Sequence, residues 1–177
     1  TRCQPFWKIA ENMKSKIVAT ILTVLSSLSA FAQKPAQPLI IETPETWKVE
    51  FEGKKNMQFY TVTLKEEGSA LLMLSRWSVP GTSSEIPKLV ASLKDAFLEQ
   101  VKGNEQLKIT STKHEVKKIK GDTFSGNFVK FKIKGGIVQT MFMIGQKKDL
   151  WNGQFTGTEK QWSEALAIIQ KIKKKGE

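Results

Sequence analysis

The residues of this chain best placed to act together are three lysines that alternate with apolar residues, Lys130, Lys132 and Lys134. Alternation is typical of a half-buried β-strand, so the three ammonium groups are expected on one strand face within about 14 Å. Such a row, named here the lysine ladder, could bind an anionic group. It could also be a solvated face, or protect an edge strand from pairing with other chains, and base rates favour this plainer interpretation. We retain the ladder as the candidate patch for an anionic or protein partner.

The sequence offers little for catalysis. His114 is the single histidine, and no G-x-S-x-G motif is present to expose a nucleophilic serine. No Walker or dinucleotide-binding glycine motif occurs, and Gly135-Gly136 lies between two expected strands, as a hairpin turn would. We therefore predict no catalytic or cofactor-binding residue, no cofactor and no enzymatic activity. A carboxylate pair assembled only by folding stays open as the alternative.

Ligands for a metal ion are also scarce. The chain has one cysteine, Cys3, one histidine and three aspartates. Its acidic residues do not follow the spacing of a calcium-binding loop. We therefore expect no metal site.

Residues 13–32 have the pattern of a secretory signal peptide. Two lysines precede an apolar run over residues 17–28, which is too short to span a bilayer. An A-x-A site ends at Ala32, so cleavage is expected between Ala32 and Gln33. We interpret residues 1–12 as an upstream leader outside the fold. The product is then periplasmic or secreted and has no transmembrane anchor.

After the expected cleavage site, a short mobile tether, residues 33–38, leads into one predicted domain, residues 39–177. This domain has no cysteine, so its core alone must stabilise it. The chain's formal net charge of +11 favours anionic partners such as lipid headgroups, acidic glycans or an acidic protein. We set nucleic acid aside because lysine far outnumbers arginine and the product is exported. We expect a monomer.

Apolar and alternating segments predict strands, with weaker candidates at 107–110 and 113–120. The stronger segments are 47–52, 59–64, 70–74, 124–134, 137–144 and 149–155. Helical spacing predicts an amphipathic helix over 86–101, capped by Ser84. A capping box at Thr158 predicts a second helix, whose end carries lysines favourable to the helix dipole.

Short turns between successive strands require antiparallel pairing. Segments 70–74 and 137–144 are apolar at both parities, which is typical of strands covered on both faces. Two helices could provide this cover, one on each side. The expected fold class is therefore α+β, a central antiparallel β-sheet with helices on both faces, an α/β/α sandwich.

This order of elements resembles the PsbP/Mog superfamily. The resemblance rests on residues 41–47, which read I-x-x-P-x-x-W, on the mid-chain helix, and on residues 150–158 leading into the terminal helix. The superfamily includes the extrinsic PsbP protein of photosystem II, a Ran-binding nuclear import factor and exported bacterial proteins of unknown role. The resemblance covers about Leu39 to Lys175 and implies a scaffold that binds proteins or small ligands. No functional residue is carried over from it.

Two of the tryptophans, Trp77 and Trp151, are expected near loops, where an indole could serve a binding site, although core packing is the favoured interpretation. Taken together, these features predict an exported, non-catalytic binding or accessory protein of the cell envelope. Two alternatives stay open. One is an envelope hydrolase that uses a carboxylate pair, and the other is a small-molecule carrier with a cavity under its first helix.

Overall fold

The computed structural model describes residues 37–54, 57–66, 70–102, 104, 107–111 and 113–176. These residues belong to the second of two units into which the chain divides, Pro35–Glu177. The predicted leader, the signal peptide and the cleavage residues Ala32 and Gln33 lie outside the described residues.

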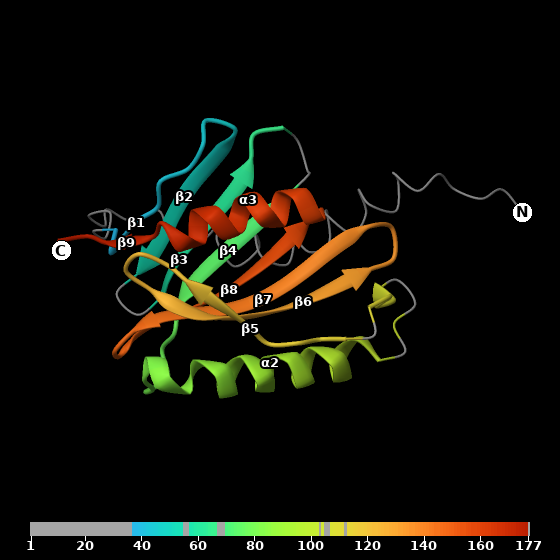
Figure 1. The fold of residues 1–177 in the computed structure, drawn as a ribbon. Helices are drawn as coiled ribbons and strands as arrows, with labels where there is room; N and C mark the ends of the chain where they lie inside the picture. The colour runs from blue at the N-terminus through green and yellow to red at the C-terminus, as the bar shows by residue number, and fades with distance from the viewer. Residues whose placement is uncertain are drawn as a thin grey trace, which may run out of the picture. The chain divides into compact units, whose positions relative to one another are not determined.

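Seven strands form one antiparallel sheet in the order β2-β3-β4-β8-β7-β6-β5 (Figure 1). Their bounds are β2 Trp47–Lys54, β3 Met57–Leu64, β4 Leu71–Arg76, β5 Lys117–Lys120, β6 Ser125–Ile133, β7 Ile137–Gln146 and β8 Asp149–Gly157. A separate two-stranded sheet pairs β1 (Leu39–Ile40) with β9 (Lys173–Lys174). The antiparallel pairing that the short turns predict is confirmed for every described pair.

The two predicted helices are present. They are α2 (Ile86–Val101), preceded by the short 3-10 helix η1 (Ser83–Glu85), and α3 (Glu159–Gln170). The capping box of α3 is confirmed, because the Thr158 N–H donates to the Gln161 side chain at 2.8 Å. None of the helices in the described part of the chain is long and apolar enough to cross a membrane.

Two details of the helix ends differ from the prediction. The expected cap Ser84 lies inside η1, and Thr82 caps this helix instead, its N–H donating to the Glu85 carboxylate at 2.7 Å. The terminal helix ends at Gln170, and Lys173–Lys174 then form β9. These two lysines pair with β1. They therefore do not belong to the end of the helix, where the sequence predicts that lysines interact favourably with the helix dipole.

Buried side chains form two clusters. One holds Trp162 and Ala165 of α3, and the other holds Ile86 and Val90 of α2. Consecutive residues of a strand point to opposite faces, so Phe128 joins the α3 cluster and its neighbour Val129 joins the α2 cluster. The sheet therefore separates the two clusters.

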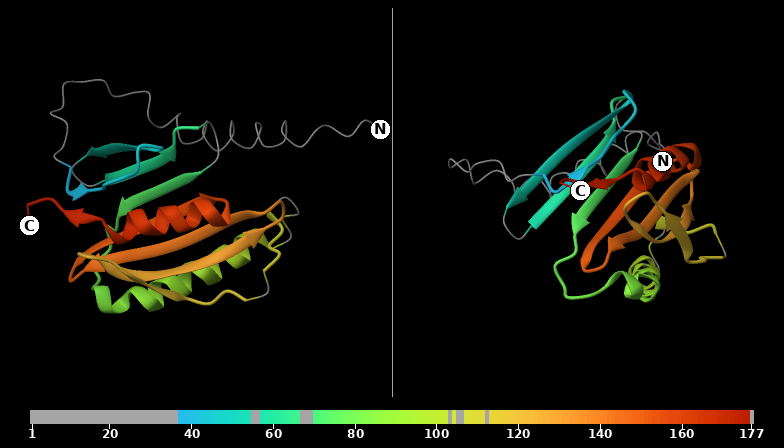
Figure 2. Two further views of the ribbon diagram at one scale, coloured as in Figure 1. Left: turned by 45° about the horizontal axis from the view of Figure 1, so that its top comes forward. Right: turned by 60° about the vertical axis from the view of Figure 1, so that its left-hand side comes forward.

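The expected α/β/α sandwich is wrong. The described fold is mostly β, with a seven-stranded and a two-stranded antiparallel sheet and only two α-helices. The α2 helix packs against β6 and β7 and does not extend over β2 and β3 (Figure 2). In β4, Leu71 and Met73 are half-buried and belong to neither cluster, so the apolar segment 70–74 does not have the second layer that its composition predicted.

Candidate functional site

Lys130 and Lys132 of the lysine ladder lie on β6, whereas Lys134 lies one residue beyond the end of this strand. Its apolar neighbours Val129 and Phe131 are both fully buried, at 0% exposure, on the side of α2. Lys130 and Lys132 therefore share the opposite side with Phe128, which packs in the α3 cluster. The alternation was a reliable guide to which side chains share a face.

The structure separates Lys130 from the other two lysines. Its Nζ forms an ion pair and a hydrogen bond with the carboxylate of Glu159, the first residue of α3. The Lys130 side chain is 25% exposed, against 54% for Glu159. Glu159 offsets the charge of Lys130, whereas neither Lys132 nor Lys134 has an ion-pair partner among the described residues.

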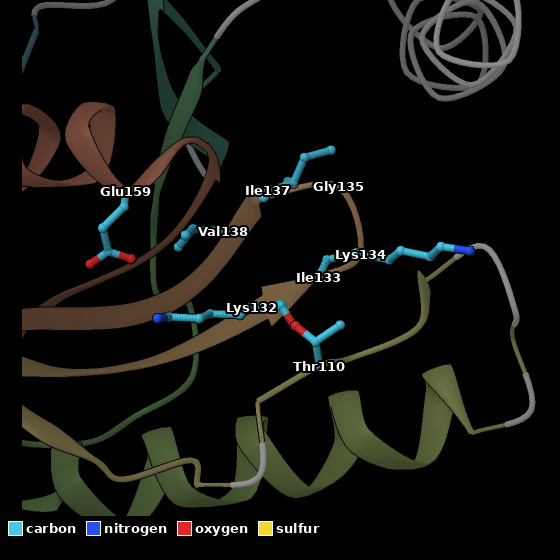
Figure 3. Close-up of a pocket in the computed structure, with 9 residues that line it drawn as sticks. Thr110, Lys132, Ile133, Lys134, Gly135, Ile137, Val138 and Glu159 are labelled. Atoms are coloured by element: carbon cyan, nitrogen blue, oxygen red, sulfur yellow. The ribbon is translucent and has the colours of Figure 1, made fainter. Parts of the chain in front are cut away.

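A surface depression of about 330 Å³ lies where β6 meets β7. Lys132 and Glu159 line it, together with Thr110 and apolar residues of the β6–β7 hairpin. Figure 3 shows Lys132 reaching toward the side of the depression where Glu159 lies, and Lys134 extending away from both. The depression therefore has a cation and a carboxylate at its border.

The hairpin at this site turns through Gly135 and Gly136, whose φ angles are 90° and 78°. Positive φ at consecutive positions favours glycine, because a Cβ would clash with the backbone. The predicted turn at these glycines is confirmed, but it also includes Lys134, which was predicted in the strand. It places Lys134 at the tip, one residue beyond the end of β6 at Ile133.

The lysines of β5 extend the positive charge along this edge of the sheet. β5 pairs with residues 125–128 of β6, so Lys117 faces the same side as the ladder, while Lys118 and Lys120 face the other side. Residues 108–111 cover the rest of β6, since the Thr110 N–H donates to the Lys132 carbonyl at 2.8 Å. We call these six exposed lysines the basic edge: Lys108, Lys117, Lys118, Lys120, Lys132 and Lys134.

His114 has two contacts that the sequence did not predict. Its Nδ1 lies 3.4 Å from the Ser111 hydroxyl, and its ring packs against Phe131 with centroids 4.9 Å apart. The Ser111 hydroxyl also accepts a hydrogen bond from the Lys132 N–H at 3.1 Å. Ser111 thus completes the pairing of β6 with its neighbouring segment, which fits a structural role better than that of a nucleophile.

Trp151 packs in the core, as the favoured interpretation predicted, and Trp77 does so in part. Trp47 and Trp162 are 3% exposed and Trp151 is fully buried, all in the α3 cluster. Trp77 is half-buried against the α2 cluster. None of the described tryptophans lines either depression that we describe.

A second depression, of about 240 Å³, lies between β1 and the first strands of the sheet. Tyr60 contributes to its wall, and the Tyr60 hydroxyl accepts from the Leu39 N–H at 2.9 Å and donates to the Leu39 carbonyl at 3.2 Å. Burial raises the pKa of the Tyr60 phenol above its ordinary value of 10.0, and the Leu39 hydrogen bond offsets part of this rise. The neutral Tyr60 hydroxyl therefore links β3 to β1 through its two hydrogen bonds with Leu39.

The two depressions do not contain the features that the alternative functions would use. Among the described residues that line them, Glu159 is the single carboxylate, and a hydrolase of the proposed kind needs two. Neither depression lies beneath α2, where a carrier cavity was expected. Three or more His, Cys, Asp or Glu side chains do not gather as metal ligands anywhere in the described part.

Comparisons with known proteins add one weak likeness. No family model matches the chain, and no curated protein matches it. A crystal structure from Bacteroides thetaiotaomicron is similar at 16% identity and a TM-score of 0.43, over 78% of this chain and 46% of that one. This chain thus spans about half the length of the structure that it matches. The likeness is too weak to support an argument, and the PsbP/Mog resemblance stays a prediction.

Proposed function

We propose that this chain is an exported, non-catalytic binding or accessory protein of the cell envelope that holds an acidic surface through its basic edge. The observation that carries the proposal is the charge of this edge. Its six lysines are exposed, and none has an ion-pair partner among the described residues. Unpaired ammonium groups on one edge produce a positive field that attracts anionic surfaces.

Binding of this kind needs no enclosed pocket. Lysine side chains are long and flexible, so they can follow a row of anionic groups whose spacing is irregular. Each lysine near an acidic lipid surface contributes about 1 kcal/mol, and salt screens this attraction beyond about 10 Å at 0.1 M ionic strength. Acidic lipid headgroups on the outer side of a membrane are therefore a suitable partner.

The test replaces Lys132 and Lys134, which have no described ion-pair partner, with glutamate. The Lys132→Glu, Lys134→Glu variant should bind vesicles of mixed phosphatidylglycerol and phosphatidylcholine at least about 30-fold less tightly than the wild type, because the loss of two lysines alone removes about 2 kcal/mol. Co-sedimentation measures the binding, and vesicles of phosphatidylcholine alone give the uncharged reference. Lys130 is left in place because its replacement would also break the ion pair with Glu159.

A matched control separates the basic edge from net charge. Lys65 and Lys88 are exposed and lie outside the basic edge, so Lys65→Glu with Lys88→Glu changes the net charge equally. This control should keep most of the binding. Equal losses in the two double variants, or no loss in either, would contradict the proposal.

Export needs a separate measurement. Intact-mass analysis of the protein from its native host should find a chain that begins at Gln33. A chain that retains residues 17–28 in the cytosolic fraction would contradict export. Native mass spectrometry of the same material would favour the carrier alternative if it detected a bound small molecule.

A further inference from the structure

The opposite edge of the sheet has a different character. β2 is the terminal strand, and its eight residues pair on one side only, with β3. Among the described residues, no strand pairs with its outer side. The N–H and C=O groups on that side form a row that a further strand could bind.

The charges on β2 alternate in a self-complementary way. Lys48 and Glu50 are exposed on one face of the strand, and their side chains form an ion pair at 2.7 Å. Between them, Val49 points to the opposite face and is half-buried against the α3 cluster. Two antiparallel copies of β2 centred on Val49 would place Lys48 of each copy opposite Glu50 of the other.

Neighbouring registers are less favourable. A pairing centred on Glu50 would pair Lys48 with Glu52 but would place the Glu50 carboxylate directly opposite its own copy, and one centred on Phe51 would place Glu50 opposite Glu52. Like charges directly opposite one another destabilise a strand pair, whereas opposite charges stabilise it. Moving the centre by one residue shifts one strand by two positions relative to the other, and only such even shifts keep the same faces of the two sheets aligned. The charge pattern thus selects the register centred on Val49.

The residues of β2 that face the α3 cluster also suit this register. Val49 would lie opposite its own copy, and Trp47 opposite Phe51, so apolar residues would meet apolar residues. Phe51 is half-buried in the monomer, and the nearby Ile40 is 42% exposed. A second sheet placed in continuation of the first would cover part of this apolar surface.

We infer that two copies of this chain associate through their β2 strands, in antiparallel register about Val49, to form a continuous sheet with twofold symmetry. This departs from the monomer that the sequence predicts. An interface of one strand pair is small, so the association is weak and depends on protein concentration and salt.

Charge reversal at the predicted pair tests the inference. Sedimentation velocity on the full chain should show a dimer that increases with concentration. Lys48→Glu alone or Glu50→Lys alone converts both intermolecular ion pairs into like-charge pairs and should weaken the dimer about tenfold. The double variant should restore it. The control Lys118→Glu, an equal change at the basic edge, should leave dimerisation unchanged.

A disulfide fixes the register independently. In a Cys3→Ser background, Val49→Cys should form a cross-linked dimer on oxidation, because facing Cβ atoms in an antiparallel pair lie within reach of a disulfide. The control Glu52→Cys lies on the same strand but away from its own copy, and it should not cross-link. A wild type that stays monomeric at every concentration would overturn the inference. This result is expected if another segment or protein binds the β2 edge. Equal cross-linking at both positions, or a dimer insensitive to both charge reversals, would also overturn the inference.

Discussion

The two edges of the seven-stranded sheet solve one physical problem in different ways. Both leave backbone groups without a strand partner in the described structure, which exposes them to pairing with other chains. β5 is four residues long, and all but Ile119 are lysines, which repel a second copy of the same strand. β2 is twice as long, and its charges of both signs favour one self-pairing. The comparison teaches that edge charge can prevent association or direct it, depending on how the signs alternate.

The edges also differ in how they are attached to the core. Ile119, 2% exposed, is the single buried residue of β5. β2 begins instead with Trp47, which is 3% exposed and whose indole N–H donates to the Glu164 carboxylate of α3 at 3.2 Å. The edge proposed to carry an intermolecular contact is thus anchored by a large aromatic side chain.

Removing this anchor should have the largest effect on the β2 edge. Trp47→Ala should lower the free energy of unfolding by about 3–5 kcal/mol, because it leaves a cavity and removes the bond to Glu164. Trp47→Phe keeps most of the packing and should cost less. Urea denaturation measures both. A Trp47→Ala variant as stable as the wild type would show that the β2 edge does not depend on α3.

Tyr60→Phe tests the attachment of β1 beside this edge. The variant should lose about 1–3 kcal/mol at neutral pH, since the buried Leu39 N–H and C=O lose their partner. The raised pKa of Tyr60 gives the effect a pH dependence. As the pH rises through 10.0, the phenol ionises first in the unfolded chain, so the stability that the folded phenol contributes falls. The difference between wild type and variant should therefore narrow above pH 10.0 in parallel urea titrations. A constant difference would contradict this assignment.

The smallest effect is expected at the basic edge. Lys130→Glu should cost about 1 kcal/mol or less, because the partly exposed ion pair with Glu159 becomes a like-charge pair. Lys132→Glu, which breaks no ion pair that we observe among the described residues, should change stability by less than about 0.5 kcal/mol. Thermal melts at low salt measure both. Equal effects would mean that Glu159 does not distinguish the two lysines.

Local features of the fold were predictable from sequence because neighbouring residues determine them. The spacing of apolar residues gave α2, Thr158 and Gln161 gave the start of α3, and the two glycines at 135 and 136 gave the hairpin. The alternation along β6 also assigned Lys130 and Lys132 to one strand face, although Lys134 lies in the hairpin turn. Each of these depends on contacts within a few positions along the chain.

Other features depend on contacts between distant residues and were missed. Lys130 and its partner Glu159 are 29 positions apart, and no sequence pattern links them. The pairing of β1 with β9 joins the first and last described strands. Because no local pattern links them, Lys173 and Lys174 were predicted as the charged end of the terminal helix. The predicted fold class was wrong because an apolar residue in a strand, such as Leu71 or Met73, indicates that its side chain is buried to some degree. It does not indicate whether a second layer covers that whole face of the sheet.

The pairing of Leu39 with Lys174 has a mechanical consequence. The two strands run in opposite directions, so the segments before Leu39 and after Lys174 leave from the same end of the pair. A force that pulls these segments apart loads the hydrogen bonds of β1 and β9 one after another, not all at once. The small sheet should therefore open at low force in a single-molecule stretching experiment, before tension reaches the larger sheet.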